Sequence, residues 1–230
     1  MISHIADPKP VKLFIGMLSP EISLFDELKE KLKDIFGAID LESPVREWGH
    51  TDYYSKEMGA DLKRKFIFFE KLISPEAISE IKLKTNELER QYLNENNPPS
   101  SPFSKGGIRK SFSYSPPLAK SDRLDTEGGR GDLKEGSKGG FEAGVDGFNG
   151  GRRINLDPGY LDSAKVVLVS TKDFSHRIYL GRGIYGEVTL VYSGKNYQTF
   201  PYTYPDFRTQ EYFDIFKKAR DMYKNQSTRI

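Results

Sequence analysis

Hydrophobic and polar positions in the first part of the chain follow strand and helix patterns in turn. Residues 11–18, VKLFIGML, form a continuous apolar run of the length of a buried strand, and residues 63–73, KRKFIFFEKLI, form a second one. Residues 40–48 are expected to form a weaker strand at a sheet edge, because Pro44 has no N–H to donate to a neighbour.

Two segments next to these strands have helical periodicity. Apolar residues recur at spacings of three and four in residues 25–36 and again in residues 78–92. A Ser-Pro-Glu triplet, which supplies an N-cap, a first-turn proline and an acid, precedes each segment at Ser19 and Ser74. The predicted order of elements is therefore β-α-β-β-α.

The last third of the chain is predicted to contain several strands and one helix. The strand-like segments are residues 152–156, 165–170, 177–180, 187–192 and 197–200. Thr209 can cap a final helix with apolar residues along one side. The complete order predicts an α+β protein with a ferredoxin-like β-α-β-β-α-β core, extended by a C-terminal β-meander and helix.

Residues 97–150 have a different composition from the rest of the chain. They contain 11 Gly, 5 Pro and 8 Ser in 54 residues, without helical or strand periodicity. We predict a disordered, low-complexity insert and expect residues 1–96 and 151–230 to form one α+β domain together. The alternative, a regulatory or nucleic-acid-binding tail, is less favoured because the charges of this segment nearly cancel.

The stretch GRGIYGEV at 181–188 has the glycine spacing of kinase and dinucleotide-binding loops. A dinucleotide loop must lead into a helix, whose N-terminus meets the phosphates, but the residues that follow Gly186 alternate like a strand. Kinase motifs and a Walker A sequence are also lacking. We therefore interpret these glycines as part of a turn or bulge between Leu180 and Val188.

Composition narrows the remaining classes of function. The 35 Lys and Arg residues against 33 Asp and Glu give a net charge of +2, so nucleic acid is an unlikely partner on bulk charge. Without cysteine the chain has no disulfides and no thiolate metal site. The N-terminal residues lack a signal pattern and no apolar run is long enough for a membrane span, so a soluble cytoplasmic protein without membrane contact is expected.

Several longer motifs resemble one family of bacterial and archaeal proteins. The motifs are YYSKEMG at 53–59, IKLKTNELE at 81–89, NLDPGYL at 155–161, STKDFSHRIYLGRGIYGEVTL at 170–190 and TYPDF at 203–207. Together they resemble the family known as domain of unknown function 4416, over nearly all of the chain except residues 97–150. The family pattern runs from the second helix straight into the Asn-x-Asp-Pro-Gly-Tyr motif, so the insert is a departure in this chain. The resemblance implies no activity.

A group of polar residues around the predicted strands 165–170 and 177–180 is the candidate site. Hydroxyl, ammonium and guanidinium groups in a short stretch favour a phosphate or carboxylate ligand, since arginine forks pair with either. The alternative is a solvated strand end with ordinary surface ion pairs. The candidate anion-binding residues are Ser170, Thr171, Lys172, Arg177 and Arg182.

Acidic and imidazole groups are the candidates for catalysis. His176, Glu187 and Asp157 can act as an acid–base group if they converge, although Asp157-Pro158-Gly159-Tyr160 also fits a simple type II turn. Glu57, Asp157 and Glu187 can hold Mg²⁺ on the same condition. Asp52 and Asp206 are further acids expected on loops.

Two hypotheses about function stay open at this point. The first is an anion-binding domain, with or without enzymatic activity, that handles a small phosphorylated or carboxylated metabolite. The second is a non-enzymatic module that binds protein or RNA, or mediates assembly, through its sheet face and its aromatic C-terminal hairpin. The aromatic residues concerned are Tyr197, Phe200, Tyr202, Tyr204 and Phe207. The sequence does not fix the oligomeric state.

Overall fold

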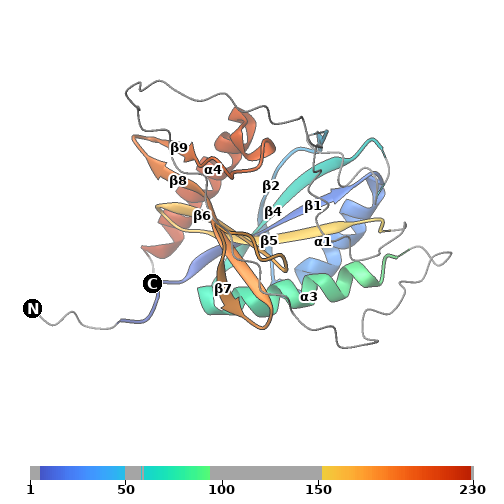
Figure 1. The fold of residues 1–230 in the computed structure, drawn as a ribbon, viewed down its shortest axis with the longest axis horizontal. Helices are drawn as coiled ribbons and strands as arrows, with labels where there is room; N and C mark the ends of the chain where they lie inside the picture. The colour runs from blue at the N-terminus through green and yellow to red at the C-terminus, as the bar shows by residue number, and fades with distance from the viewer. Residues whose placement is uncertain (1–5, 50–57, 59, 94–151, 229–230) are drawn as a thin grey trace, which may run out of the picture. The chain divides into compact units, whose positions relative to one another are not determined.

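The computed structural model describes residues 6–49, 58, 60–93 and 152–228. In this part of the chain, nine strands form one antiparallel sheet with three α-helices packed against it, so the protein belongs to the α+β class (Figure 1). The first half contains β1 (Val11–Ser19), α1 (Ser23–Phe36), β2 (Ile39–Glu42), β3 (Arg46–Glu47), β4 (Lys63–Ile73) and α3 (Ile78–Arg90). The second half contains β5 (Asn155–Leu161), β6 (Lys165–Ser170), β7 (Ile178–Gly181), β8 (Ile184–Ser193), β9 (Asn196–Thr199) and α4 (Gln210–Ser227).

The strands lie in the order β2-β4-β1-β5-β6-β8-β7, with the short β3 beside β4 and β9 beside β8. The continuous apolar run predicted as a buried strand is β1, which lies between β4 and β5 and is buried along its whole length. Pro44 separates β2 from β3, and β2 lies at one end of the strand order, as the proline predicted.

The sheet separates two apolar cores. Leu13, Ile15 and Met17 of β1 point to the face covered by α1 and α3. The residue between two of them, Phe14, points to the other face and packs with Phe216 of α4, at 5.0 Å between ring centroids. Figure 1 shows α4 on the opposite side of the sheet from α3, and this arrangement explains why the central strands are apolar on both faces.

The predicted helices are confirmed, with one correction at a helix start. The hydroxyl of Ser74 caps the short 3₁₀ turn Pro75–Ala77 that leads into α3, and Thr209 caps α4 by accepting from the Tyr212 N–H. The triplet at Ser19 does not cap α1. Ser19 is the last residue of β1, and α1 begins only at Ser23, without a side-chain cap.

The prediction of a type II turn at Asp157-Pro158-Gly159-Tyr160 is wrong. These residues lie inside β5, which begins three residues later than the strand expected at 152–156, and they pair with β1 along the whole strand. A proline is tolerated at position 158 because it has no N–H to donate and the pairing of β5 with β6 begins only at Gly159 and ends at Leu161. Gly159 has no positive φ; the ring of Phe14 and the carbonyl of Val167 lie where its Cβ would be.

The glycine-rich stretch at 181–188 contains a turn between two strands, as predicted, and its later residues already belong to β8. Gly181, Arg182 and Gly183 all have positive φ angles, of 101°, 57° and 78°, and form the turn between β7 and β8. Gly186 lies in β8, where the side chain of Leu180 takes the space a Cβ would need. The loop leads into a strand, so it has no helix N-terminus to offer a phosphate.

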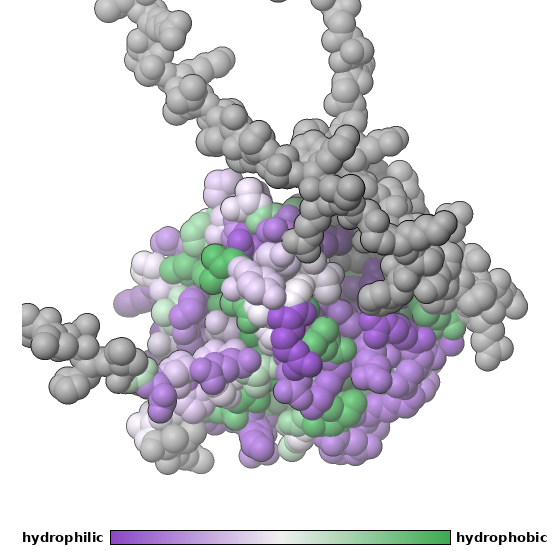
Figure 2. All heavy atoms as spheres, turned by 60° about the horizontal axis from the view of Figure 1, so that its bottom comes forward, coloured by the Kyte–Doolittle hydropathy of each residue, from purple (hydrophilic) through white to green (hydrophobic). Residues whose placement is uncertain are grey.

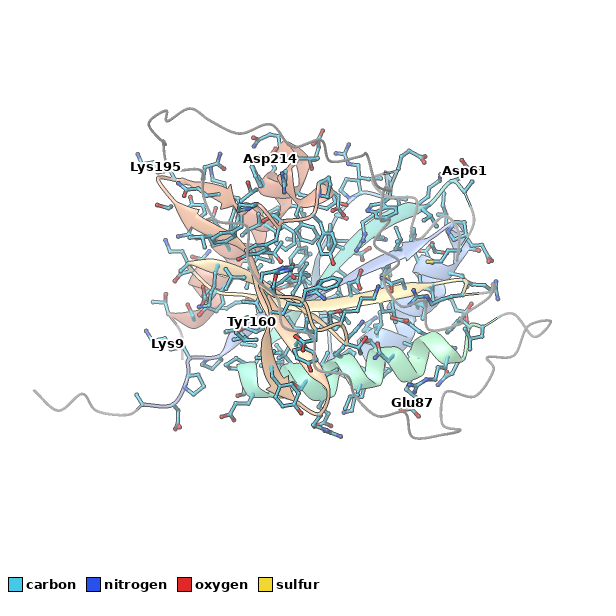
Figure 3. The ribbon with its side chains drawn as sticks, viewed as in Figure 1. Lys9, Asp61, Glu87, Tyr160, Lys195 and Asp214 are labelled. Carbon is cyan, nitrogen blue, oxygen red and sulfur yellow. The ribbon has the colours of Figure 1, made fainter. Side chains whose placement is uncertain are left out.

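Two other turns need left-handed backbone at residues with side chains. Asp61 and Lys195, labelled in Figure 3, have φ angles of 59° and 69° and lie before β4 and between β8 and β9. Figure 2 shows mostly polar side chains on the face that comes forward, with the apolar residues in separate patches. No helix in the described residues is long and apolar enough to cross a membrane.

The two chain ends that border residues 94–151 lie side by side. Leu93 and Arg152 form an antiparallel bridge, and the Arg152 Nη1 atom lies 3.0 Å from the Glu89 carboxylate in α3. The prediction of disorder for residues 97–150 falls outside the described residues. The bridge shows that a short connection is enough to join α3 to β5.

We therefore expect that replacing residues 94–151 with a Gly- and Asn-containing loop of about four residues leaves a soluble domain. Thermal unfolding followed by circular dichroism should remain cooperative. A deletion that also removes Arg152 and Arg153 is the control, and it should be less stable because Glu89 and Glu21 lose their arginine partners. Loss of cooperative unfolding in the shorter deletion would contradict the expectation.

A methyl group at Gly159 should destabilise the protein, because a Cβ there would lie 2.5 Å from the Phe14 ring. We expect Gly159→Ala to lower the free energy of unfolding by about 1–3 kcal/mol, the usual cost of overpacking. Gly49→Ala is the matched control, since no atom of the described residues beyond its chain neighbours lies within 4 Å of its added Cβ. Equal stabilities of the two variants in a denaturant titration would refute the close-packing explanation.

Candidate functional site

The candidate site is built around a carboxylate that is almost completely buried. Glu187 lies on β8 opposite Leu168 of β6, and its side chain is only 1% exposed. Its Oε2 accepts hydrogen bonds from Arg177 Nε at 2.7 Å and lies 2.9 Å from His176 Nε2, while Oε1 accepts from Thr189 at 3.2 Å. A buried carboxylate needs such partners, because burial without them costs several kcal/mol.

Arg177 is held in place on several sides. Its guanidinium also donates from Nη1 to the Lys172 carbonyl at 3.0 Å and from Nη2 to the Tyr204 hydroxyl at 2.9 Å. The side chain is 3% exposed and lies 4.6 Å from the centre of the Phe174 ring. Burial opposes its charge, but Glu187 and Tyr204 outweigh this effect and raise the pKa of Arg177, so the side chain stays protonated.

His176 lies on the outer side of the Glu187 carboxylate. Its ring is stacked on Tyr202 at 4.3 Å and 10°, and Tyr202 is stacked in turn on Phe200 at 5.1 Å and 2°. A histidine held against a carboxylate can exchange protons with a ligand that reaches it. The ring contacts Glu187 and Tyr202 but is not among the residues that line the pocket, so a positioning role toward the carboxylate fits His176 better than contact with a ligand there.

A second group of charges surrounds Arg64 on β4. Its Nη1 donates to Asp157 Oδ2 at 3.1 Å, and its Nη2 lies 3.9 Å from Asp206 Oδ2, which accepts from Trp48 Nε1 at 3.0 Å. The guanidinium has room to lie across β1 because residue 16 is glycine, where a Cβ would lie 2.9 Å from Arg64 Nη1.

Asp157 connects this group to α3. Its Oδ2 also accepts from Asn155 Nδ2 at 2.7 Å, and Asn155 accepts from Arg152, which pairs with Glu89. Partial burial opposes the charge of Asp157, but Arg64, Lys82 and the Asn155 hydrogen bond outweigh it and lower the pKa of the carboxyl group. Asp157 is therefore ionised near neutral pH.

Both groups of charges line one pocket of about 80 Å³. Its charged residues are three cations (Arg64, Lys172 and Arg177) and three acids (Asp157, Glu187 and Asp206), and the other lining residues are Trp48, Leu168, Val169, Ser170, Tyr204 and Phe207. One water molecule needs about 10–15 Å³ of cavity volume on the same measure, so the pocket has room for a group of several heavy atoms.

The structure brings together most of the residues that the sequence suggested. Ser170, Lys172 and Arg177 of the anion-binding set line the pocket, as do Asp157, Glu187 and Asp206. Thr171 is exposed beside the pocket and is not part of its lining, and Arg182 is on the hairpin turn between β7 and β8.

The proposed magnesium ligands are only partly within the described structure. Glu57 and Asp52 lie outside it, whereas Asp157 and Glu187 both face the pocket. Among the described residues, no group of three or more His, Asp or Glu side chains is arranged to hold a metal ion.

Sequence reasoning missed Arg64, Trp48 and Asn155. Two signals were available: a charged residue inside the apolar strand 63–73, and a glycine inside the apolar run 11–18. The second signal indicates that another group approaches the backbone closely. Neither signal identifies the partner, because Asp157 is 93 residues away from Arg64 in the sequence.

The fold and site describe an α+β protein with a small charged pocket on one face of an antiparallel sheet. The sequence profile of the family described as "Domain of unknown function (DUF4416)" matches residues 9–98 and 139–223, which is more than half of the chain. The protein belongs to this family. No curated protein and no solved structure gives a significant match to the chain.

The lowered pKa of Asp157 predicts a dependence of stability on pH. Because the pKa lies below the ordinary value of 3.8, the ionised carboxylate stabilises the fold at neutral pH, and this contribution is lost as the pH falls through the folded-state pKa. We expect Asp157→Asn to lower the free energy of unfolding at pH 7 by about 1–3 kcal/mol, and the difference to shrink below about pH 4.

Denaturant titrations at a series of pH values measure this difference. Asp214→Asn, at an exposed position of α4, is the matched control and should change the stability at pH 7 by less than about 0.5 kcal/mol. A constant difference between Asp157→Asn and the parent protein down to pH 3 would show that the ionised carboxylate does not stabilise the fold.

Proposed function

We propose that this protein binds a small ligand through a phosphate or carboxylate group in the pocket lined by Arg64, Lys172 and Arg177. The observation that carries the proposal is the state of Arg177. It is buried and its orientation is fixed, yet within the described part of the chain its hydrogen bonds use three of the five guanidinium N–H groups. Two N–H groups of a residue that lines the pocket remain for a ligand.

The acids of the pocket favour this function by fixing the cations before a ligand arrives. Glu187 and Tyr204 hold Arg177, and Asp157 holds Arg64, so little side-chain entropy is lost on binding. The three acids and three cations of the lining balance each other formally. Affinity for an anion must therefore come from directed hydrogen bonds more than from net charge, which favours the planar fork of arginine.

The alternative of a binding or assembly module has weaker support. Two of the five aromatic residues on which it depends, Tyr197 and Phe207, are buried in the core against α4. Phe200 and Tyr202 are stacked on each other, and Tyr204 lines the pocket, where its hydroxyl accepts from Arg177 Nη2. These contacts assign the aromatic cluster mainly to packing and to the pocket wall.

We also infer that residues 1–96 and 151–230 form a single domain, whose first part has a ferredoxin-like arrangement. The order β-α-β-β-α-β is accompanied by a sheet in which β1 and β4 are central and β2 and β5 flank them. This is the arrangement expected of a split β-α-β unit. The pairing of β1 with β5 joins the two sequence segments into one sheet.

The chain contains one tryptophan, Trp48, which lines the pocket and therefore reports binding directly. We expect inorganic phosphate or a small carboxylate such as malonate to change the Trp48 fluorescence with a saturable dependence on concentration. Arg177→Lys keeps a charge beside Glu187 but removes the fork, and it should weaken binding about tenfold. Arg177→Gln should weaken it further if the variant folds.

Arg182→Gln is the matched control, because Arg182 is exposed on the hairpin turn and does not line the pocket. Its binding curve should equal that of the parent protein. The proposal fails if no anion changes the fluorescence, or if Arg182→Gln weakens binding as much as Arg177→Lys. Phosphate and malonate, compared at equal ionic strength, distinguish the two kinds of anion.

A further inference from the structure

The β7–β8 hairpin presents two adjacent cross-strand pairs, which lie on opposite faces of the sheet. Tyr179 lies opposite Tyr185, and Ile178 lies opposite Gly186. Arg177 and Glu187 continue this register, with Nε and Oε2 2.7 Å apart. Alternate residues of a strand share a face, so the tyrosine pair lies on the side of the ion pair, and Ile178 lies on the opposite side.

The tyrosine pair borders the pocket. Tyr185 lies opposite Ser170 of β6, and Ser170 is part of the pocket lining. Residues two apart on a strand are separated by roughly 7 Å, so the pair begins about this distance from Arg177 and Glu187, in the direction of the hairpin turn. A molecule bound at Arg177 would reach the tyrosine rings if it extended by a few bonds.

The Tyr179 ring is largely exposed to solvent, although it packs beside Tyr185. The residue is 62% exposed, and its ring centre lies 5.3 Å from that of Tyr185 with 57° between the planes. Within the described part of the chain, its hydroxyl oxygen accepts one long hydrogen bond, of 3.4 Å, from the Gly183 N–H. An exposed aromatic ring beside a polar pocket can stack on a planar ring of a ligand bound there.

We propose that the ligand of the pocket is an aromatic or heteroaromatic anion, whose ring stacks on Tyr179 while its phosphate or carboxylate group contacts Arg177. This inference rests on the proposed function and names the class of ligand. Ile178 is also exposed, but it lies on the opposite side of the hairpin from Arg177, so the ring and the anion are expected together on the tyrosine side.

The test compares ligands of equal charge and similar size by isothermal titration calorimetry: phenyl phosphate with cyclohexyl phosphate, and benzoate with cyclohexanecarboxylate. The parent protein should bind the aromatic member of the preferred pair about three- to tenfold more tightly. Tyr179→Leu keeps an apolar side chain on the strand and should bring this ratio close to one, with the affinity for inorganic phosphate or acetate unchanged.

Ile178→Ala changes an exposed neighbour on the opposite face and should leave the ratio as in the parent protein. Equal affinities of the aromatic and alicyclic ligands for the parent protein would overturn this inference while the proposed anion site stands. An aromatic preference that persists in Tyr179→Leu would place the ring elsewhere and overturn it as well. If none of the anions binds, the proposed function fails and the inference fails with it.

Discussion

A buried carboxylate must have positive charge or hydrogen-bond donors beside it, and Glu187 imposes this requirement on the whole site. Its carboxylate is hydrogen-bonded to Arg177 and His176, which lie in the segment before β7, and to Thr189 of its own strand. Arg177 then fixes the Lys172 carbonyl and the Tyr204 hydroxyl. This side of the pocket thus follows from satisfying one charge, and the cation that satisfies it keeps N–H groups for a ligand.

The same requirement recurs where the sheet meets its covering elements. Lys12 of β1 is completely buried and donates to Asp40 of β2 at 2.7 Å and to Gln226 of α4 at 3.0 Å. Burial lowers the pKa of Lys12 despite the opposing effect of Asp40. Lys82 of α3 donates to the Leu156 carbonyl, and Arg64 connects β4 to β5. Each of these groups has its partner in another element, so the polar contacts favour one arrangement of the elements.

Local patterns predicted much of the fold but little of what lies between distant segments. The spacing of apolar residues in α3 and α4, the cap at Thr209 and the glycine hairpin at 181–183 all depend on near neighbours in the sequence. The turn prediction for Asp157-Pro158-Gly159-Tyr160 was wrong because glycine is needed there to make room for Phe14. A rule based on neighbouring residues does not include this distant contact. The part of the pocket around residue 177 could be predicted from the sequence, because its residues are close together in the chain. Arg64 and Trp48 could not, because only tertiary contacts bring them to the pocket.

The most direct measurement of the central claim is an NMR titration with inorganic phosphate that follows the Nε–H signal of Arg177 and the indole N–H signal of Trp48. The indole signal is unique because the chain has one tryptophan. An anion bound in the pocket predicts that both signals shift along one saturable binding curve. Shifts confined to exposed arginines such as Arg182, or no shift at all, would contradict the account.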